Sequence, residues 1–585
     1  MMEGTSFEEG GSAVSVAEDP ALGLDQRAKI EILGAILLAL FLGALDQTIV
    51  GTALPKIVTE LGGNDYYTWV VTIYLLTSTI TVPFYGKLSD IYGRRPLLMI
   101  GVSIFLIGSA LSGLSQNMFE LILFRGIQGL GAGALFPISL AVIGDLFTPA
   151  ERGKYQGLFG AVFGVSFIVG PALGGFLTDS ISWHWVFYVN LPIGLLSLYI
   201  IGRLLPTIKR AGATRNFDFL GAIVFTVGIS FLLVGLTNKL SADWTDVSVG
   251  GFIGIGLVLS LIFVFIESRT TEAIVPLDLW RIRTYVASIL ATFFVSFGFF
   301  GAIIFLPRFF QVVRGDSATA SGYEIFPLLI GLIGSSIVAG LIVSRTGRYK
   351  VLVITGLVIM AVGITLMTQL QSTTELTTFW FWMFVTGVGI GPTLSVFTIV
   401  VQNAVPFNKL GVATSNLTFF RQIGGSVGLA ISGTVFGQSL ADKLPAQIGP
   451  VFGQVMTKAT PDFQVLLGQA QATLQSHLDV NNLTGVGQSF GKAVSDALIK
   501  QYPDKAALIH ANLDSFIPQL DGSFHQAFSL AIGQTFQIGV VACIAAVVMA
   551  VFMRDIPLRK SFGPSTAVEA VPAPASSARG EANPA

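Results

Sequence analysis

Asp46 and Arg125 stand within strongly apolar stretches of the chain. If these stretches cross a membrane, an ionisable side chain inside them costs roughly 2.5–3.5 kcal/mol and marks a candidate functional site. A carboxyl group shielded from water holds its proton more tightly, and a nearby cation weakens that hold. Because a guanidinium stays charged at any relevant pH, Arg125 is the natural partner of Asp46. We therefore expect this pair to load and release a proton, with Gln128 on the same helix face as Arg125.

Structural interpretations of these residues are also open from the sequence alone. Asp46 could lie near the outer membrane surface, held by hydrogen bonds with the two residues that follow it, and Arg125 could only anchor helix packing. Glu324, at the start of another apolar stretch, is a third candidate. It would bind a second proton or cation, or form an ion pair with Arg308 on an adjacent helix.

The stretch at 153–178 is apolar and rich in glycine. Its first four glycines are spaced by four, three and four residues, which places them on one face of a helix. In a bilayer such a face allows a second helix to approach closely, and Pro171 kinks or weakens the helix. We expect a hinge and a close-contact surface here, the alternative being ordinary packing of small residues. The glycines are Gly153, Gly157, Gly160, Gly164, Gly170, Gly174 and Gly175.

The composition of the chain excludes a water-soluble globular fold. Of its 585 residues 52% are hydrophobic and 11% are charged, whereas soluble domains carry roughly 25% charged residues. Because so few charges cannot cover a surface of this size in water, lipid must cover most of it. The net charge of −1 gives no reason to expect a nucleic-acid partner, and the one cysteine, Cys543, cannot form an intrachain disulfide.

Fourteen stretches are long and apolar enough to cross a bilayer, which takes about 20 residues in a helix. The expected fold is therefore an all-α integral membrane protein with fourteen transmembrane helices. The stretches are 30–53, 68–86, 96–115, 118–142, 154–178, 184–205, 217–236, 249–267, 286–312, 322–344, 350–370, 378–402, 412–437 and 526–553.

Basic residues are distributed unevenly among the loops that join these spans. One set of alternating loops holds most of them, and the positive-inside rule assigns that set to the cytoplasm. Both termini then lie in the cytoplasm, the polar segment 438–525 lies outside, and we expect a multi-pass protein of the plasma membrane. The cytoplasmic set holds Lys87, Arg94, Arg95, Arg152, Lys154, Arg203, Lys209, Arg210, Arg215, Arg269, Arg281, Arg283, Arg345, Arg348, Lys350 and Lys409.

An internal repeat divides the spans into two related groups. The segments 86–95 and 340–349 follow the second and tenth spans, and each has two glycines seven residues apart with an arginine after the second. This repeat predicts two six-helix bundles with two inserted helices, and such proteins place the substrate site between the bundles. The expected divisions are a disordered cytoplasmic N-terminus (1–28), the N-terminal bundle (29–205), the two inserted helices (206–284), helices 9–13 (285–437), a large, partly helical external loop (438–525), helix 14 (526–556) and a disordered cytoplasmic tail (557–585).

Several strings in the chain resemble signatures of the major facilitator superfamily. The loop after the second span resembles its cytoplasmic-loop signature, and the string 170–175 resembles the fifth-helix antiporter motif of its drug exporters. Strings at 45–55, 125–131, 182–194 and 414–428 extend the resemblance to the fourteen-helix drug:proton antiporter branch. In the loop, Asp90 would pair with an arginine or with a helix N-terminus of the opposite bundle and close the cytoplasmic side. The loop residues are Gly86, Asp90, Gly93, Arg94 and Arg95.

The resemblance implies a proton-coupled secondary exporter of lipophilic or cationic small molecules such as drugs, working by alternating access. An endogenous lipid, siderophore or metabolite is the alternative cargo, motivated by the large segment 438–525. Protons would be the coupling ion, with no other cofactor, and the unclustered histidines predict no metal site. We expect no enzymatic activity, since the chain has no phosphate-loop motif, and we expect a monomer whose partners are lipophilic substrates and membrane lipids.

Overall fold

The chain is helical, without β-strands, throughout the residues that the computed structural model describes: 24–61, 67–206, 217–239, 242–270, 273–458, 460–466 and 490–558. The expected disordered tails lie almost entirely outside these residues. The helices are α1 (Gln26–Leu61), α2 (Tyr67–Tyr92), α3 (Arg94–Ser112), α4 (Met118–Leu146), α5 (Pro149–Ser180), α6 (Trp185–Tyr188), α7 (Asn190–Leu204), α8 (Phe219–Asn238), α9 (Phe252–Glu267), α10 (Arg283–Val313), α11 (Ala318–Glu324), α12 (Phe326–Thr346), α13 (Lys350–Met367), α14 (Leu376–Ala404), α15 (Leu410–Lys458), α18 (Phe490–Gln501), α19 (Ala506–Leu513) and α20 (Ile517–Val551).

Thirteen helices among the described residues are long and apolar enough to cross a membrane. The all-helical membrane fold is therefore confirmed, whereas the count of fourteen is not. The predicted span that is not among the thirteen is 412–437, which lies in α15. Polar residues such as Arg421 and Gln422 interrupt the apolar run of that helix.

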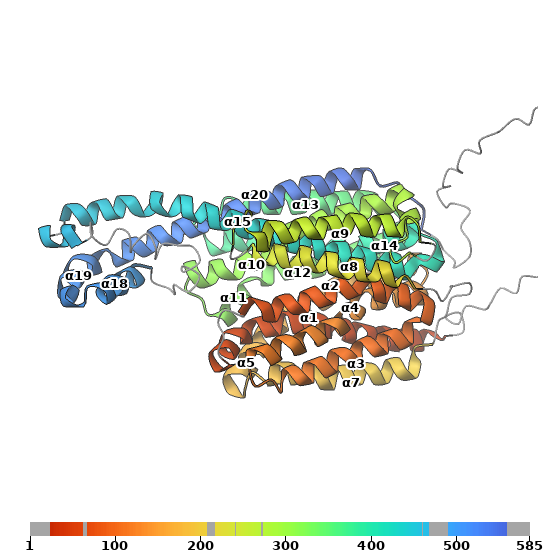
Figure 1. Cartoon of the computed structure of the whole chain (residues 1–585). Helices are drawn as coiled ribbons and strands as arrows, with labels where there is room; N and C mark the ends of the chain where they lie inside the picture. Colours follow the sequence, from red (N-terminus) through yellow and green to blue (C-terminus); the bar gives the residue numbers. More distant parts are fainter. Residues whose placement is uncertain are drawn as a thin grey trace, which may run out of the picture.

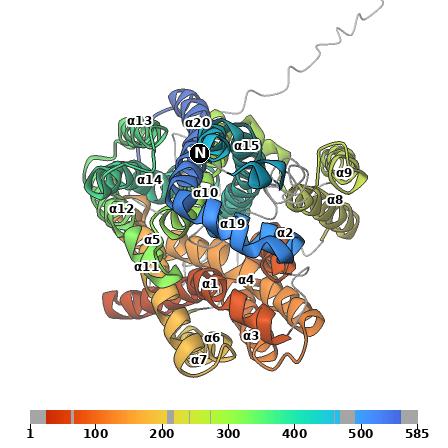
Figure 2. The same cartoon turned by 90° about the vertical axis from the view of Figure 1, so that its left-hand side faces the viewer.

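Two helix bundles lie side by side (Figure 1). Helices α1 to α7 pack among themselves, and α10 to α15 pack with α20. The inserted helices α8 and α9 pack on each other, and α8 also contacts α2 and α15. Figure 2 shows this inserted pair at one side of the two bundles. The pair therefore covers the edge where α2 of one bundle meets α15 of the other.

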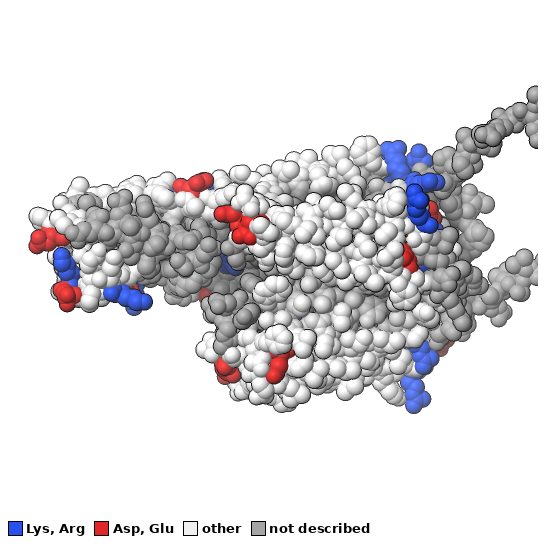
Figure 3. All heavy atoms as spheres, viewed as in Figure 1, with Lys and Arg blue, Asp and Glu red and all other residues white. Residues whose placement is uncertain are grey.

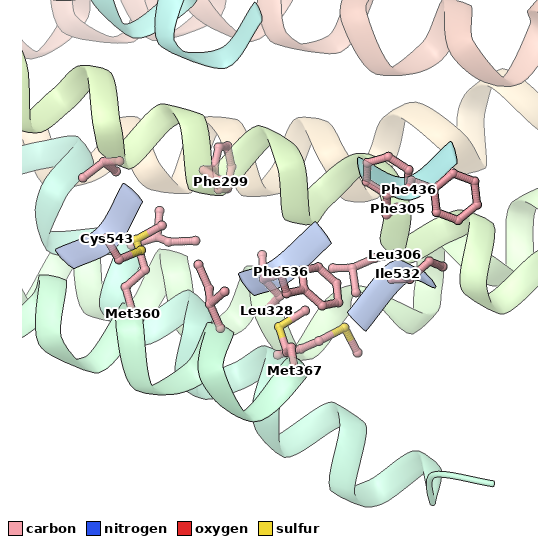
Figure 4. Packing of buried hydrophobic residues seen from close by; sticks show 14 of the residues in the cluster. Phe299, Phe305, Leu306, Leu328, Met360, Met367, Phe436, Ile532, Phe536 and Cys543 are labelled. Carbon is pink, nitrogen blue, oxygen red and sulfur yellow. The ribbon is translucent and has the colours of Figure 1, made fainter. Parts of the chain in front are cut away.

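The second bundle is held together by a continuous core of buried apolar side chains (Figure 4). Phe305 of α10 and Phe436 of α15 lie with their ring centroids 5.2 Å apart. Met360 of α13 and Cys543 of α20 are fully buried in the same core. This core fixes α15 against α10 and α20.

A helical projection extends from one end of the second bundle (Figure 1, left). Helix α15 continues past the predicted boundary at 437 to Lys458, and α20 begins at Ile517 instead of 526. Both extensions, with α18 and α19, bury apolar side chains such as Leu440, Leu498 and Leu520. Apolar residues recur along α15 beyond 437 with helical spacing, which is why the helix continues where a partly helical loop was expected.

Charged side chains gather at the ends of the bundles and leave the surface between them uncharged (Figure 3). Lys and Arg cluster at the end away from the projection. Exposed arginines stand at or just after the C-terminal ends of α7, α9 and α12, namely Arg203, Arg269, Arg345 and Arg348. We call this the basic end. The apolar band between the two ends is the part that lipid would cover.

Candidate functional site

Asp46 of α1 is surrounded by polar side chains from two other helices. Its Oδ2 lies 2.5 Å from Nη1 of Arg125, and its Oδ1 accepts a hydrogen bond from Nε2 of Gln128 at 2.8 Å. Asn190, the first residue of α7, donates to the same Oδ1 at 3.3 Å. Arg125 also donates to Oε1 of Gln128 at 2.8 Å. The fold thus brings together the three residues singled out in the sequence and adds a fourth.

This group is sealed from solvent, with Asp46 0% and Arg125 1% exposed. The guanidinium carbon of Arg125 lies 4.1 Å from the centre of the Tyr74 ring, and its Nε donates to the carbonyl of Val70 at 3.4 Å. Because water cannot screen the two charges, each depends on the other for compensation. Protonation of Asp46 would remove its charge and leave the Arg125 cation without a counter-ion.

Sequence reasoning did not identify Asn190 as a member of this group. Its side chain lies at the junction of α6 and α7 and also donates to Oγ of Ser109 at 3.1 Å. A lone asparagine in an apolar run is the signal that could have identified it. The interpretation of Asp46 as a residue held by its neighbours is not supported, because the hydroxyl of Thr48 donates to the carbonyl of Leu45 instead.

The Asp46 group lies in the half of the bundle away from the basic end. Asp46 is twenty residues into α1, which corresponds to about 30 Å from the start of that helix. Arg125 is seven residues into α4, about 10 Å from the end opposite the basic end. A proton would therefore have the shorter path from the side that carries the projection.

Glu324, the third candidate, lies in the second bundle at the end of α11. It accepts a hydrogen bond from Nε1 of Trp380 at 2.8 Å. This bond ties Glu324 to α14, and the expected ion pair with Arg308 stays a prediction. Glu324 is therefore not part of the Asp46 group, and its role as a second proton site stays a prediction.

Asp90 links the two bundles at the basic end. Its carboxylate accepts hydrogen bonds from the backbone nitrogens of Gly411 and Val412, at 3.2 and 3.0 Å. These nitrogens belong to the first turn of α15, where backbone donors are free and the helix dipole favours negative charge. The contact joins α2 of the first bundle to α15 of the second, as the expected latch would.

Arg94 holds Asp90 in place. Its guanidinium lies 2.5 Å from Asp90 and 2.8 Å from Asp145 at the end of α4, and it is 1% exposed. Asp145 was not identified from the sequence, although an acidic residue just after the predicted fourth span is the signal that could have revealed it. One buried cation therefore serves two buried carboxylates from different helices.

The other residues of the loop signature, Gly86, Gly93 and Arg95, shape the turn and the helix contacts around Asp90. Gly93 has φ of 100° between α2 and α3, a conformation that side chains other than glycine rarely adopt. A side chain on Gly86 would overlap the hydroxyl of Ser415 on α15. Arg95 donates to the carbonyl of Gly202 on α7. The two glycines thus permit the turn and the approach of the bundles, and Arg95 ties α3 to α7.

A second polar contact between the bundles surrounds Gln402 of α14. Its Nε2 donates to the carbonyl of Leu140 on α4 at 3.0 Å and to Thr414 on α15 at 3.2 Å. Its Oε1 accepts from Gln156 of α5 at 3.1 Å. With the Asp90 contact, this network joins the bundles near the basic end, and sequence reasoning did not identify it.

We predict that Asp90→Asn loosens the first turn of α15. The neutral amide loses the charge–dipole attraction, which is worth about 1 kcal/mol for a partly buried acid at a helix N-terminus. Hydrogen–deuterium exchange of the peptide at 410–416 should accelerate several-fold. Asp278→Asn is the matched control, because Asp278 forms an exposed ion pair with Lys409 beside the same turn and such pairs contribute little. Equal exchange in Asp90→Asn and wild type would contradict the latch.

The first four glycines of α5 form a close-contact surface with α12, which belongs to the other bundle. A side chain on Gly153 would overlap the carbonyl oxygen of Gly340, and a Cβ on Gly160 would lie 2.5 Å from Ser336. Gly157 packs against Ile337 of α12, and Gly164 packs against Ile333 of α12. We call this surface the α5–α12 seam. The expected close contact is therefore present, and it joins the two bundles.

Beyond the seam, α5 turns its glycines toward α1 of its own bundle. Side chains on Gly170 and Gly174 would overlap the hydroxyls of Thr48 and Thr52, whereas Gly175 is partly exposed. Helix α5 runs unbroken through Pro171. The role of Pro171 as a hinge stays a prediction, placed at the position where the glycines change partners.

We predict that Gly153→Ala destabilises the protein by forcing α5 and α12 apart. The new methyl group meets backbone atoms of Gly340, which cannot move aside as a side chain would, and such overpacking costs roughly 1–3 kcal/mol. Thermal unfolding in detergent should begin at a lower temperature. Gly334→Ala on α12 is the control, because a Cβ there meets nothing within 4 Å. If both variants unfold at the wild-type temperature, the seam is not a tight contact.

The model of the major facilitator superfamily matches residues 36–429, which include most of the first bundle, the second bundle up to the first half of α15, and the whole Asp46 group. The chain belongs to the major facilitator superfamily. This confirms the family that the signature strings indicated. The two bundles and the contacts between them are thus those of a membrane transporter of this superfamily.

Relatives from bacteria support the same family. The multidrug transporter protein MdtP of Bacillus subtilis is 40% identical over 456 residues, which are 77% of this chain and 84% of the relative. Multidrug resistance protein 3 of the same organism is 36% identical over 71% of this chain and 81% of its own length. The chain is therefore similar along most of its length to proteins named for multidrug transport.

Solved structures show the same major facilitator fold. The human organic anion transporter MFSD10 (TETRAN) has a TM-score of 0.52 at 17% identity, covering 70% of this chain and 94% of its own. A bacterial homologue of the human lysosomal transporter Spinster has a TM-score of 0.51 at 15% identity, covering 91% of this chain and 98% of its own. At these identities the likeness concerns the fold alone.

Proposed function

We propose that this major facilitator protein is a proton-coupled exporter of lipophilic small molecules, working by alternating access. The buried pair of Asp46 and Arg125 is the observation that carries the proposal. Among the described residues of the first bundle, its carboxylate is the one group that combines complete burial, a buried cation and a position in the outer half of the helices. The similarity to multidrug transporters favours drugs and other lipophilic compounds as the cargo.

In this proposal the basic end faces the cytoplasm and the projection faces the outside of the plasma membrane. The positive-inside rule supports that orientation, because exposed arginines gather at the basic end. The proton then enters from outside, since Asp46 lies nearer to that side. The coupling ion crosses against the direction of the cargo.

Protonation of Asp46 would shift the balance between two arrangements of the bundles. In the paired state the carboxylate attracts Arg125 and the bundles touch at the basic end through Asp90 and Gln402. A protonated Asp46 no longer attracts the cation, so the helices that carry the pair, α1 and α4, are less strongly held together. Helix α1 also packs on α5, and α5 forms the seam with the second bundle. Coupling would therefore run from Asp46 through α1 and α5 to the α5–α12 seam.

Transport by purified protein in liposomes tests this function. An imposed pH gradient should drive accumulation of ethidium, and nigericin, which collapses the gradient, should stop it. ATP should have no effect. Accumulation that ignores the gradient, or that requires ATP, would contradict the proposal.

A further inference from the structure

Arg421 lies at mid-depth in the second bundle. It is eleven residues into α15, which corresponds to about 16 Å from the basic end, while the hydrocarbon core of a bilayer is about 30 Å thick. Its Nε and Nη2 atoms are shielded from solvent and make no hydrogen bond. Among the described residues, no ion pair, hydrogen bond or aromatic contact of this side chain is found. A cation here is costly unless something compensates it.

The fully buried arginines of the described residues all have partners, whereas Arg421 is partly exposed. Arg94 pairs with two carboxylates and Arg125 with one. Arg152 donates to the backbone carbonyls of Phe147 and Gly144. Arg421 differs from them, because the described residues supply no counter-charge to its shielded Nε and Nη2 atoms.

Among the described residues, no acidic side chain pairs with Arg421. Helices α10, α12, α13 and α14 contain no Asp or Glu, and α15 contains none before Asp442. Glu324 is bound to Trp380 at the far end of the second bundle. In the first bundle, Asp46 is paired with Arg125 and Asp90 with Arg94. The membrane part of the second bundle is therefore cationic at its centre.

The helical positions around Arg421 place it on a face of α15 that packs on α10 and, two turns earlier, meets the Gln402 contact between the bundles. Thr414, two turns earlier on the same face, accepts from Gln402, which also reaches α4 of the first bundle. Phe419, on the other side of the helix, packs against α2 and α8 instead. Gly425, one turn after Arg421, meets the Phe300 ring, and a Cβ there would lie 2.6 Å from it. Arg421 thus lies on an inward face with an aromatic ring one turn away.

We propose that Arg421 binds the anionic group of a transported molecule, so that the cargo includes lipophilic anions and zwitterions with a carboxylate or similar oxyanion. A guanidinium forms paired hydrogen bonds with such groups, and Phe300 supplies an apolar surface for the rest of the molecule. The ligand would provide the counter-charge that the chain lacks. This inference rests on the proposed exporter function and adds a substrate class to it, beyond cationic drugs.

A pair of fluorescent dyes that differ by one carboxylate charge and one methyl group tests the inference. The probes are a rhodamine with a free carboxylate and its methyl ester, and binding to the full-length protein in detergent is measured by fluorescence anisotropy. Wild type should bind the acid, and Arg421→Gln should weaken that binding at least about tenfold, as loss of a charged hydrogen-bond partner does. Binding of the ester should change less than twofold. Arg421→Lys, which keeps the charge, should retain part of the acid binding. Arg345→Gln, an exposed arginine at the basic end, is the control.

The results that differ from these expectations contradict either the inference or the proposed function. Wild type that fails to bind the acid, or Arg421→Gln that binds it as wild type does, overturns the inference. Equal loss of acid and ester binding in both Arg421 variants also overturns it, because it indicates a structural role. Since binding is measured without a pH gradient, charge-selective binding by a protein that shows no gradient-driven transport would contradict the proposed function and leave the Arg421 site standing.

Discussion

Asp46→Asn is expected to abolish transport driven by a pH gradient while substrate binding persists. The asparagine side chain has nearly the same shape and its oxygen can still accept from Gln128 and Asn190, but it cannot bind and release a proton at neutral pH. Arg125 then lacks its counter-ion in every state of the cycle. We expect gradient-driven accumulation of ethidium in liposomes to fall by about a hundredfold or more, because general acid–base groups contribute effects of this size. Ethidium binding in detergent should remain within a few-fold of wild type.

The matched control for this variant is Glu31→Gln. Glu31 lies in the same helix, but it is exposed and forms an ion pair with Arg27 near the basic end. Its replacement should leave transport unchanged. Wild-type transport by Asp46→Asn would show that the proton is carried elsewhere, with Glu324 as the next group to replace.

Arg94→Ala is expected to prevent the protein from folding stably. The variant leaves Asp90 and Asp145 buried without a cation, and removing one partner of a buried charge pair costs roughly 3–5 kcal/mol. The Asp145 contact also holds α4 to the start of α3. We expect a low yield of monodisperse protein and a large decrease in the unfolding temperature in detergent.

Two further variants separate the effect of losing the charge from the effect of losing side-chain volume at this site. Arg95→Ala removes a neighbouring arginine that donates to a backbone carbonyl, and its effect should be small. Combining Arg94→Met with Asp90→Asn and Asp145→Asn removes all three charges, and it should recover much of the stability lost in Arg94→Ala. Stable Arg94→Ala protein would show that the two carboxylates do not depend on this cation.

The pairing of Asp46 with Arg125 was predictable because both are ionisable residues in apolar spans, and burial leaves such charges few ways to be compensated. The interaction of Asp90 with a helix N-terminus was also predictable as one of two options, since acidic residues and free backbone donors attract each other. The choice of α15 was not, because the sequence does not say which helix of the other bundle begins beside it.

Other features of these sites could not be predicted from the sequence, and the reasons are physical. Asn190 and Gln402 are neutral polar residues, which cost less to bury than charges and so stand out less in an apolar span. The glycine spacing of α5 predicted a close contact, but spacing along one helix contains no information about its partner. Helix α15 continues to Lys458 because apolar residues recur with helical spacing among the polar residues after 437. The average composition of that segment does not show this spacing.

Proton movement caused by substrate tests the central claim most directly. Liposomes containing wild-type protein and a pH-sensitive dye would be given an imposed pH gradient and then ethidium. Exchange of protons for substrate predicts that ethidium dissipates the gradient, that the rate depends on the ethidium concentration, and that Asp46→Asn abolishes the effect. A gradient that ethidium leaves unchanged, while ethidium still crosses the membrane through the protein, would contradict the proton-coupled account.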